Sequence, residues 1–233
     1  MPDEQSVYTK HAAEYEALIS REDHQGNILK SIQQIIVPDG LDVLDLGSGT
    51  GRLACLLAPN ARSISAFDLS AHMLEVARNK LRRIRQTGWM VTAADHRFLP
   101  LTDQCADLIV SGWSASYLSV WNPLRWREET EAWFIEARRL LRPNGFIILF
   151  ESLGTGNELP QRLPHLEHFL GWLDETGFKN KWIRTDYQFG SMEEARKLAG
   201  FFFGEEMKQK IISNPSILLP ECTGVWWITP HVP

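Results

Sequence analysis

Between residues 41 and 150, short apolar segments alternate with longer amphipathic ones. The longer segments carry apolar residues three and four positions apart, as at Leu74, Ala77 and Leu81, and this spacing is typical of helices. The short segments end at glycine or polar residues, which is typical of buried strands. Strands that alternate with helices predict a parallel sheet with helices on both faces. The predicted strands are 41–46, 62–67, 89–93, 106–110 and 146–150, the last preceded by a Pro-Asn-Gly turn at 143–145.

The segments outside this region give less regular signals. Residues 9–37 predict two helices that are separated near residues 23–26. The elements expected after residue 151 are a helix over 163–175, a strand over 181–187, helical residues over 191–212 and a last strand over 224–229. Together with the five earlier strands, these elements lead us to expect an α/β fold with a seven-stranded, mostly parallel sheet, an antiparallel last strand and helical cap elements.

A glycine-rich loop is the clearest chemical feature of the chain. In residues 43–51 (VLDLGSGTG) an apolar strand leads into Gly47, Gly49 and Gly51, and a helix begins at the third glycine. Glycines let the backbone turn tightly and approach a ligand, and free N–H groups at a helix start favour a negative group. Ligands of open α/β sheets bind beyond the carboxyl ends of the strands. The loop therefore predicts a ligand site, with a purely structural tight turn as the alternative.

Two acids follow the second and third predicted strands. Asp68 lies 17 residues after Gly51, where a carboxylate can accept both hydroxyls of a ribose. The alternative is that Asp68 stabilises the start of the next helix beside Ser70, a good N-cap residue. Asp95 follows the third strand and can accept a hydrogen bond from an adenine amino group, although surface acids are common there.

Composition excludes several classes of protein. A net charge of −5 argues against general binding to nucleic acids or anionic membranes, because such binders need a cationic surface. Three cysteines without metal-site spacing favour reduced thiols in a cytoplasmic protein. The charged N-terminus lacks the apolar centre of a signal peptide, and no apolar run approaches the roughly 18 residues of a membrane span. His165 and His168 are three residues apart and so share a helix face near Glu167, but no third ligand follows at a sensible spacing, so no metal site is predicted.

A series of segments resembles, in order and spacing, the motifs of class I (Rossmann-like) S-adenosylmethionine-dependent methyltransferases. The resemblance covers residues 41–151 nearly continuously and is strongest to the small-molecule branch that includes quinone-biosynthesis methyltransferases. It implies S-adenosylmethionine as the cofactor, methyl transfer as the activity and a small molecule as the acceptor. The segments are VLDLGSGTG, FDLS with a following methionine, AAD, Leu99-Pro100, ADLIVS and RLLRPNGFIIL.

The resemblance also implies how the chain is organised. Residues 1–233 would form a single methyltransferase domain. Residues 1–37 would be an N-terminal helical lid, and residues 41–151 the cofactor-binding core. Residues 152–233 would be a C-terminal part with a helical insertion at 191–222.

The same resemblance implies a cofactor site. The glycines would surround the methionine part of the cofactor, and Asp45 would act on its ammonium group directly or through water. Asp68 would bind the ribose, while Asp95 and the neighbouring His96 would hold the base. The implied set is Tyr15, Asp45, Gly47, Ser48, Gly49, Gly51, Asp68, Leu69, Met73, Asp95, His96, Ser111 and Gly112, of which Tyr15, His96, Ser111 and Gly112 fit packing or a loop contact equally well.

The loop after the fourth strand is aromatic. Residues 111–127 contain no acid, histidine or lysine, so this loop supplies no strong base. Its aromatic side chains are expected over the reacting methyl group, which favours a small, partly apolar acceptor. We expect alignment in a closed pocket to dominate catalysis, with no single base indispensable. The predicted pocket residues are Trp113, Tyr117, Trp121 and Trp126, and the candidate bases are His96, Glu151, His165 and His168.

Departures from related patterns narrow the function. Nucleic-acid amino methyltransferases carry an Asn/Asp-Pro-Pro-aromatic motif where this chain has Ser-Gly-Trp-Ser at 111–114, and protein arginine methyltransferases need two glutamates in the same loop. A nicotinamide-dependent oxidoreductase needs Gly-x-Gly-x-x-Gly, but Arg52 occupies the last glycine position. The intact glycines and Asp68 argue against a non-catalytic binding module with this fold. The methylated atom and the oligomeric state are left open.

Overall fold

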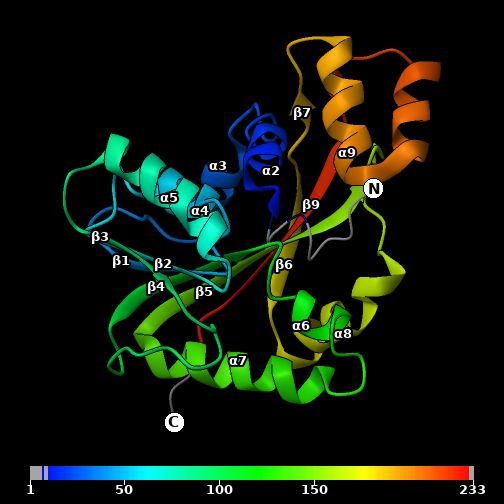
Figure 1. Ribbon diagram of the computed structural model, residues 1–233. Coiled ribbons are helices and arrows are strands. Elements are labelled where there is room, and N and C mark those ends of the chain that lie inside the picture. The colour runs from blue at the N-terminus through cyan, green and yellow to red at the C-terminus, as the bar shows by residue number, and fades with distance from the viewer. Residues whose placement is uncertain (1–6, 8–9, 231–233) are drawn as a thin grey trace.

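The computed structural model describes Val7 and residues 10–230, and a seven-stranded sheet forms its centre (Figure 1). The strand order is β3-β2-β1-β4-β5-β9-β6. Strands β1 to β5 pair in parallel, and β9 runs antiparallel to both of its neighbours. The predicted fold class is therefore confirmed. The strands are β1 (Asp42–Leu46), β2 (Ser63–Asp68), β3 (Trp89–Ala93), β4 (Ala106–Gly112), β5 (Leu141–Thr155), β6 (Lys179–Arg184) and β9 (Glu221–Ile228).

Each face of the sheet has its own hydrophobic core, because successive strand residues point to opposite faces. Val43 and Val110 pack in one core, whereas Leu44 and Leu149 pack in the other. Figure 1 shows helices on both sides of the sheet, as the alternating pattern predicts. The first core is covered by α3 (Asn27–Gln33), α4 (Arg52–Leu57) and α5 (Ala71–Ile84), and the second by α7 (Trp126–Leu140) and α8 (Glu167–Thr176).

Two local signals in the sequence shape the elements beside the site. Ser70 caps α5, because its side chain accepts a hydrogen bond from the Met73 amide at 3.2 Å. The predicted turn at 143–145 lies inside β5 as an irregularity in its pairing with β4, and Asn144 there has a φ of 67°. Strand β5 therefore begins before this turn and extends beyond the strand predicted at 146–150.

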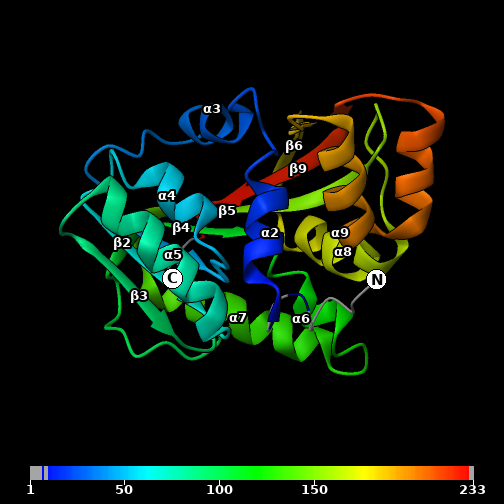
Figure 2. The same ribbon diagram turned by 45° about the horizontal axis from the view of Figure 1, so that its top comes forward.

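A cap beside the sheet combines the helix α2 (Ala12–Ile19) with a segment far along the chain (Figure 2). Leu18 of α2 packs in a hydrophobic cluster with residues of α9 (Met192–Ser213), a helix that bends at Gly204. Strands β7 (Tyr187–Gln188) and β8 (Leu218–Leu219) form a separate two-stranded sheet there. The single strand predicted over 181–187 is therefore wrong, since β6 and β7 belong to different sheets.

Two further short helices lie near the cavity and before α8, and the N-terminal region contains two helices. Helix α6 (Tyr117–Val120) lies within the aromatic stretch, and the 3₁₀ helix η1 (Pro164–Leu166) precedes α8. Helices α2 and α3 are separated near residues 23–26, as predicted, whereas residues 1–6 and 8–9 of the predicted lid lie outside the described residues. In the described part of the chain, no helix is both long enough and apolar enough to cross a membrane.

Candidate active site

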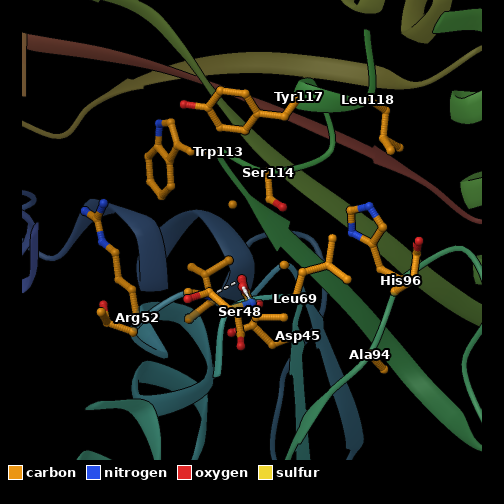
Figure 3. A pocket seen from close by; sticks show the side chains of 18 of the residues that line it. Asp45, Ser48, Arg52, Leu69, Ala94, His96, Trp113, Ser114, Tyr117 and Leu118 are labelled. Carbon is orange, nitrogen blue, oxygen red and sulfur yellow. Dashed lines mark hydrogen bonds between the residues drawn. The ribbon is translucent and has the colours of Figure 1, made fainter. Parts of the chain in front are cut away.

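A cavity of about 420 Å³ opens at the carboxyl ends of β1, β2 and β4 (Figure 3). Parallel strands end at the same edge of a sheet, so the segments that follow them meet there. Met73 and Ser111 are buried behind the lining, each 1% exposed, and Gly51 also lies outside it. The predicted site residues that line the cavity are Tyr15, Asp45, Gly47, Ser48, Gly49, Asp68, Leu69, Asp95, His96, Gly112, Trp113, Tyr117 and Trp121.

The three glycines of the loop are required for different reasons. All three have a positive φ, which favours glycine. A Cβ on Gly47 would overlap Ser114, and a Cβ on Gly51 would lie 2.8 Å from the Cβ of Ala77 in α5. A Cβ on Gly49 would meet nothing within 4 Å. Gly47 and Gly51 thus permit close packing within the protein, and of the three glycines only Gly49 has open space where a Cβ would stand.

Asp68 ties the end of β2 to the glycine loop. Its Oδ2 accepts a hydrogen bond from the Gly49 amide, and its Oδ1 accepts one from the Ser70 amide, both at 2.8 Å. Burial raises the pKa of Asp68, while these backbone hydrogen bonds oppose the rise. Asp68 therefore does stabilise the start of the next helix, as the alternative interpretation holds, and it also lines the cavity.

Asp45 places a second carboxyl group in the cavity. It is 1% exposed, and its Oδ2 accepts a hydrogen bond from the Ala54 amide at 2.8 Å. Burial raises the pKa of Asp45 to about 7, and the negative charge of Asp68 contributes in the same direction. A cationic group bound beside Asp45 would favour its ionised form.

The segment after β3 contributes an ion pair and a neutral histidine. Asp95 binds the Arg97 guanidinium, with its two oxygens 2.9 Å from Nε and 2.5 Å from Nη2. Arg97 lowers the pKa of Asp95, and also pairs with Glu129 of α7. His96 is half-buried, and burial lowers its pKa to about 4, so the imidazole is neutral at pH 7. Figure 3 shows His96 across the cavity from Arg52.

Aromatic side chains form the wall after β4. Trp113 has a φ of 51°, an uncommon conformation for a bulky residue, and its amide donates to the Phe150 carbonyl at 2.7 Å. The Trp113 ring stacks on that of Phe150, with 6.0 Å between the ring centroids. Tyr117 and Trp121 stack with centroids 4.6 Å apart. Backbone strain like that of Trp113 is typical of functional sites, where the surrounding structure holds a side chain in place.

Three of the candidate bases and one predicted pocket residue lie outside the cavity lining. Glu151 is buried beside the start of α6, where it accepts hydrogen bonds from the Ser116 amide at 3.1 Å and from Ser116 Oγ at 2.8 Å. Burial raises its pKa to about 7. His165 and His168 are exposed, and the His168 ring stacks on Trp126 with centroids 5.2 Å apart. Of the candidate bases, only His96 lines the cavity.

Arg52 lines the cavity and was not among the predicted site residues. Its Nη1 lies 2.7 Å from Glu22 Oε2, and its guanidinium carbon lies 4.4 Å from the centroid of the Trp113 ring. A signal for Arg52 does exist in the sequence, because a cation at the first position of a helix is disfavoured by the helix dipole. Its partner Glu22 lies in a distant segment, and no local pattern indicates that pairing. Ser114, Leu118 and Asn122 also line the cavity without having been predicted.

Comparison with known families places this cavity in context. Residues 44–149, which contain the glycine loop and Asp68, match the family described as a methyltransferase domain. Over this segment, just under half of its length, the chain resembles a methyltransferase domain. The match agrees with the family predicted from the sequence and with its cofactor, S-adenosylmethionine.

Curated proteins that this chain resembles act on different acceptors, as their names state. The malonyl-[acyl-carrier protein] O-methyltransferase of Hahella chejuensis is 33% identical over 144 residues, which cover 60% of this chain and 46% of that protein. The demethylmenaquinone methyltransferase of Tropheryma whipplei is 26% identical over 159 residues, which cover 62% of each protein. The chain thus spans about half to three fifths of the length of these relatives.

Solved structures share the fold of this chain. A methyltransferase from Aquifex aeolicus, described as dependent on S-adenosylmethionine, superposes with a TM-score of 0.56 at 15% identity. The superposition covers 98% of this chain and 94% of that protein. At this identity the similarity extends to the fold alone.

Proposed function

We propose that the protein transfers a methyl group from S-adenosylmethionine to a small, partly apolar or aromatic molecule. The observation that carries the proposal is the single cavity in which Asp45, Asp68 and the open side of Gly49 lie opposite an aromatic wall. The acids suit a cationic, ribose-containing ligand, and the wall suits a flat or apolar acceptor.

The residues of the cavity fit the parts of the cofactor. The space at Gly49 lets a ligand approach the backbone, and Asp68 stands where a ribose is bound in comparable folds. Asp45 is a buried carboxyl group with a raised pKa, which suits a neighbouring ammonium group. Leu69 and Ala94 supply apolar surface for a base. Asp95 can assist while it stays paired with Arg97, because a carboxylate has further lone pairs.

The chain contributes to the reaction mainly by positioning the acceptor and the cofactor. When bound, S-adenosylmethionine supplies a methyl group on a sulfonium, which is already a good leaving group. Trp113, Tyr117 and Trp121 would hold the acceptor in line and exclude water, and alignment can lower a barrier by about 7–11 kcal/mol. His96 is neutral and lies in the cavity, so it can accept a proton from an acidic acceptor group. We infer that alignment dominates and that His96 only assists.

We further propose a class of acceptor, a role for the N-terminal segment and a location for the protein. The acceptor is a small molecule rather than a nucleic acid, since the net charge of −5 disfavours a polyanion. Residues 1–37 act as a lid within a single domain, supported by Tyr15 and Ile19 of α2, which line the cavity. The protein is cytoplasmic, supported by free thiols at its three cysteines.

Calorimetric titration tests the proposed function. S-adenosylhomocysteine should bind with micromolar affinity, whereas NAD and NADP should not bind detectably. A panel of phenols, quinols, thiols and carboxylic acids with labelled S-adenosylmethionine should then yield one methylated class. Failure to bind S-adenosylhomocysteine would overturn the proposal, and binding without any turnover would favour the non-catalytic alternative.

A further inference from the structure

Two guanidinium groups line the cavity, and they differ in how far they are neutralised. Arg97 is paired with both Asp95 and Glu129. Arg52 has a single ion pair, through Nη1 to Glu22, and its Nη2 is buried without a hydrogen-bond partner among the described residues. A guanidinium carries five N–H donors. Of the two arginines, Arg52 thus keeps N–H donors that another anion can use.

Arg52 is also held rigidly. Its guanidinium lies over the ring of Trp113, which itself is fixed by its backbone hydrogen bond to Phe150 (Figure 3). Glu22, only 4% exposed, fixes the other side of the group. A cation held between an aromatic ring and a carboxylate loses little freedom when a further anion binds. The arrangement is that of a preorganised anion site.

The cavity lining carries charges of both signs. Arg52 lies against Trp113 and interacts with Tyr15, whereas Asp45 lies in β1 and Asp68 ends β2. S-adenosylmethionine has one anionic group, the α-carboxylate, and two cationic groups, the ammonium and the sulfonium. Only one orientation puts the carboxylate at Arg52 and the ammonium at Asp45.

We propose that Arg52 binds the α-carboxylate of the cofactor and thereby sets the direction in which the cofactor lies. Glu22 acts as a positioning residue, because its ion pair holds the guanidinium in place over Trp113. Glu22 belongs to the segment between α2 and α3, so the same ion pair connects the predicted lid to the bound carboxylate. The inference rests on the proposed cofactor site and adds a residue and a ligand group to it.

The test compares ligands that differ by the carboxylate. S-adenosylhomocysteine has the carboxylate and the amine, S-adenosyl-3-thiopropylamine keeps only the amine, and 5′-methylthioadenosine lacks both. Arg52→Gln should weaken S-adenosylhomocysteine at least about thirtyfold, and should change the affinity of the two other ligands less than about threefold. Asp68→Asn is the matched control, because loss of ribose contacts should weaken all three ligands alike.

Other variants keep the test decisive if Arg52→Gln does not fold. Arg52→Lys keeps the charge but lacks the planar fork, and Glu22→Gln keeps Arg52 but loosens it. Each should weaken only S-adenosylhomocysteine, by about five- to tenfold. Equal losses for all three ligands would make Arg52 purely structural. Unchanged binding of all three, with an altered KM for an anionic acceptor, would assign Arg52 to the acceptor instead. Absence of binding by wild-type protein would overturn the proposed function as well.

Discussion

Glu151 accepts two hydrogen bonds from Ser116, through its amide and its hydroxyl, and therefore lies behind the aromatic wall rather than inside the cavity. These hydrogen bonds connect the C-terminal part of β5 to the start of α6, the helix that begins at Tyr117. Glu151 is thus well placed to fix the aromatic wall, and it lies outside the cavity in which a general base would have to act.

Glu151 should make stability depend on pH. Its pKa rises from an ordinary 4.5 to about 7 on folding, so the folded state favours the protonated form. The stabilisation is complete below pH 4.5 and is lost as the pH rises through 7, at a cost of about 3 kcal/mol above that pH. Denaturant unfolding of Glu151→Gln should therefore show higher stability than wild type at pH 8.5 and no gain at pH 5. A variant destabilised equally at both values would contradict the raised pKa.

Asp68→Asn should affect both binding and stability. The Gly49 and Ser70 amides would lose a charged acceptor, and the ribose would lose its partner. Each charge-assisted hydrogen bond contributes about 1–3 kcal/mol, so S-adenosylhomocysteine should bind at least about tenfold more weakly. The Tm should fall by about 2–4 °C for each kcal/mol lost. Calorimetry and thermal unfolding give both readouts, and normal affinity would refute a cofactor role for Asp68.

Two glycine substitutions should separate ligand contact from packing. Gly49→Ala places its Cβ in open cavity space, with a strain of about 1–2 kcal/mol from the positive φ. We expect a folded protein that binds S-adenosylhomocysteine at least about fiftyfold more weakly. Gly51→Ala has the same strain but also presses on Ala77 of α5, so it should lose more stability. Equal effects on binding and on Tm for the two variants would argue against a cofactor over Gly49.

Binding of the cofactor should release a proton at mildly acidic pH. Asp45 has a pKa of about 7 in the free protein, and an ammonium group beside it would lower that pKa. Release should therefore be measurable below pH 7 and should vanish by about pH 8.5, where Asp45 is already ionised. Titrations of S-adenosylhomocysteine in two buffers of different ionisation enthalpy measure the proton count. Asp45→Asn should abolish the release, and proton uptake by wild type would be the wrong sign.

The aromatic wall should matter more than the one base in the cavity. Once an acceptor is known, His96→Ala should keep kcat within about thirtyfold of wild type, below the loss typical of a true general base. Trp113→Ala should instead lower kcat/KM by about a hundredfold or more through lost alignment. Steady-state kinetics at saturating cofactor separates the two effects. A thousandfold fall in kcat for His96→Ala, with normal cofactor affinity, would identify His96 as an essential base.

Sequence patterns predicted the parts of the site that depend on local rules. The glycine loop, Asp68 and the N-cap at Ser70 follow directly from short motifs at strand ends. The positions of the other candidate residues depend on tertiary contacts. Glu151 shares a sheet face with Leu149 because residues two apart point the same way, and α6 covers that face. Trp126 begins α7 and packs against His168, which no local pattern indicates.

The place of β9 in the sheet has a consequence for synthesis. This strand is inserted between β5 and β6, although residues 221–228 follow both in the chain. Until they leave the ribosome, β5 and β6 each lack a neighbour, and the apolar edge of β5 stays open to other chains. Sheets closed by such distant pairings form slowly. A nascent chain that stalls before residue 221 should therefore need a chaperone. A variant truncated before residue 221 should aggregate, and not merely be inactive.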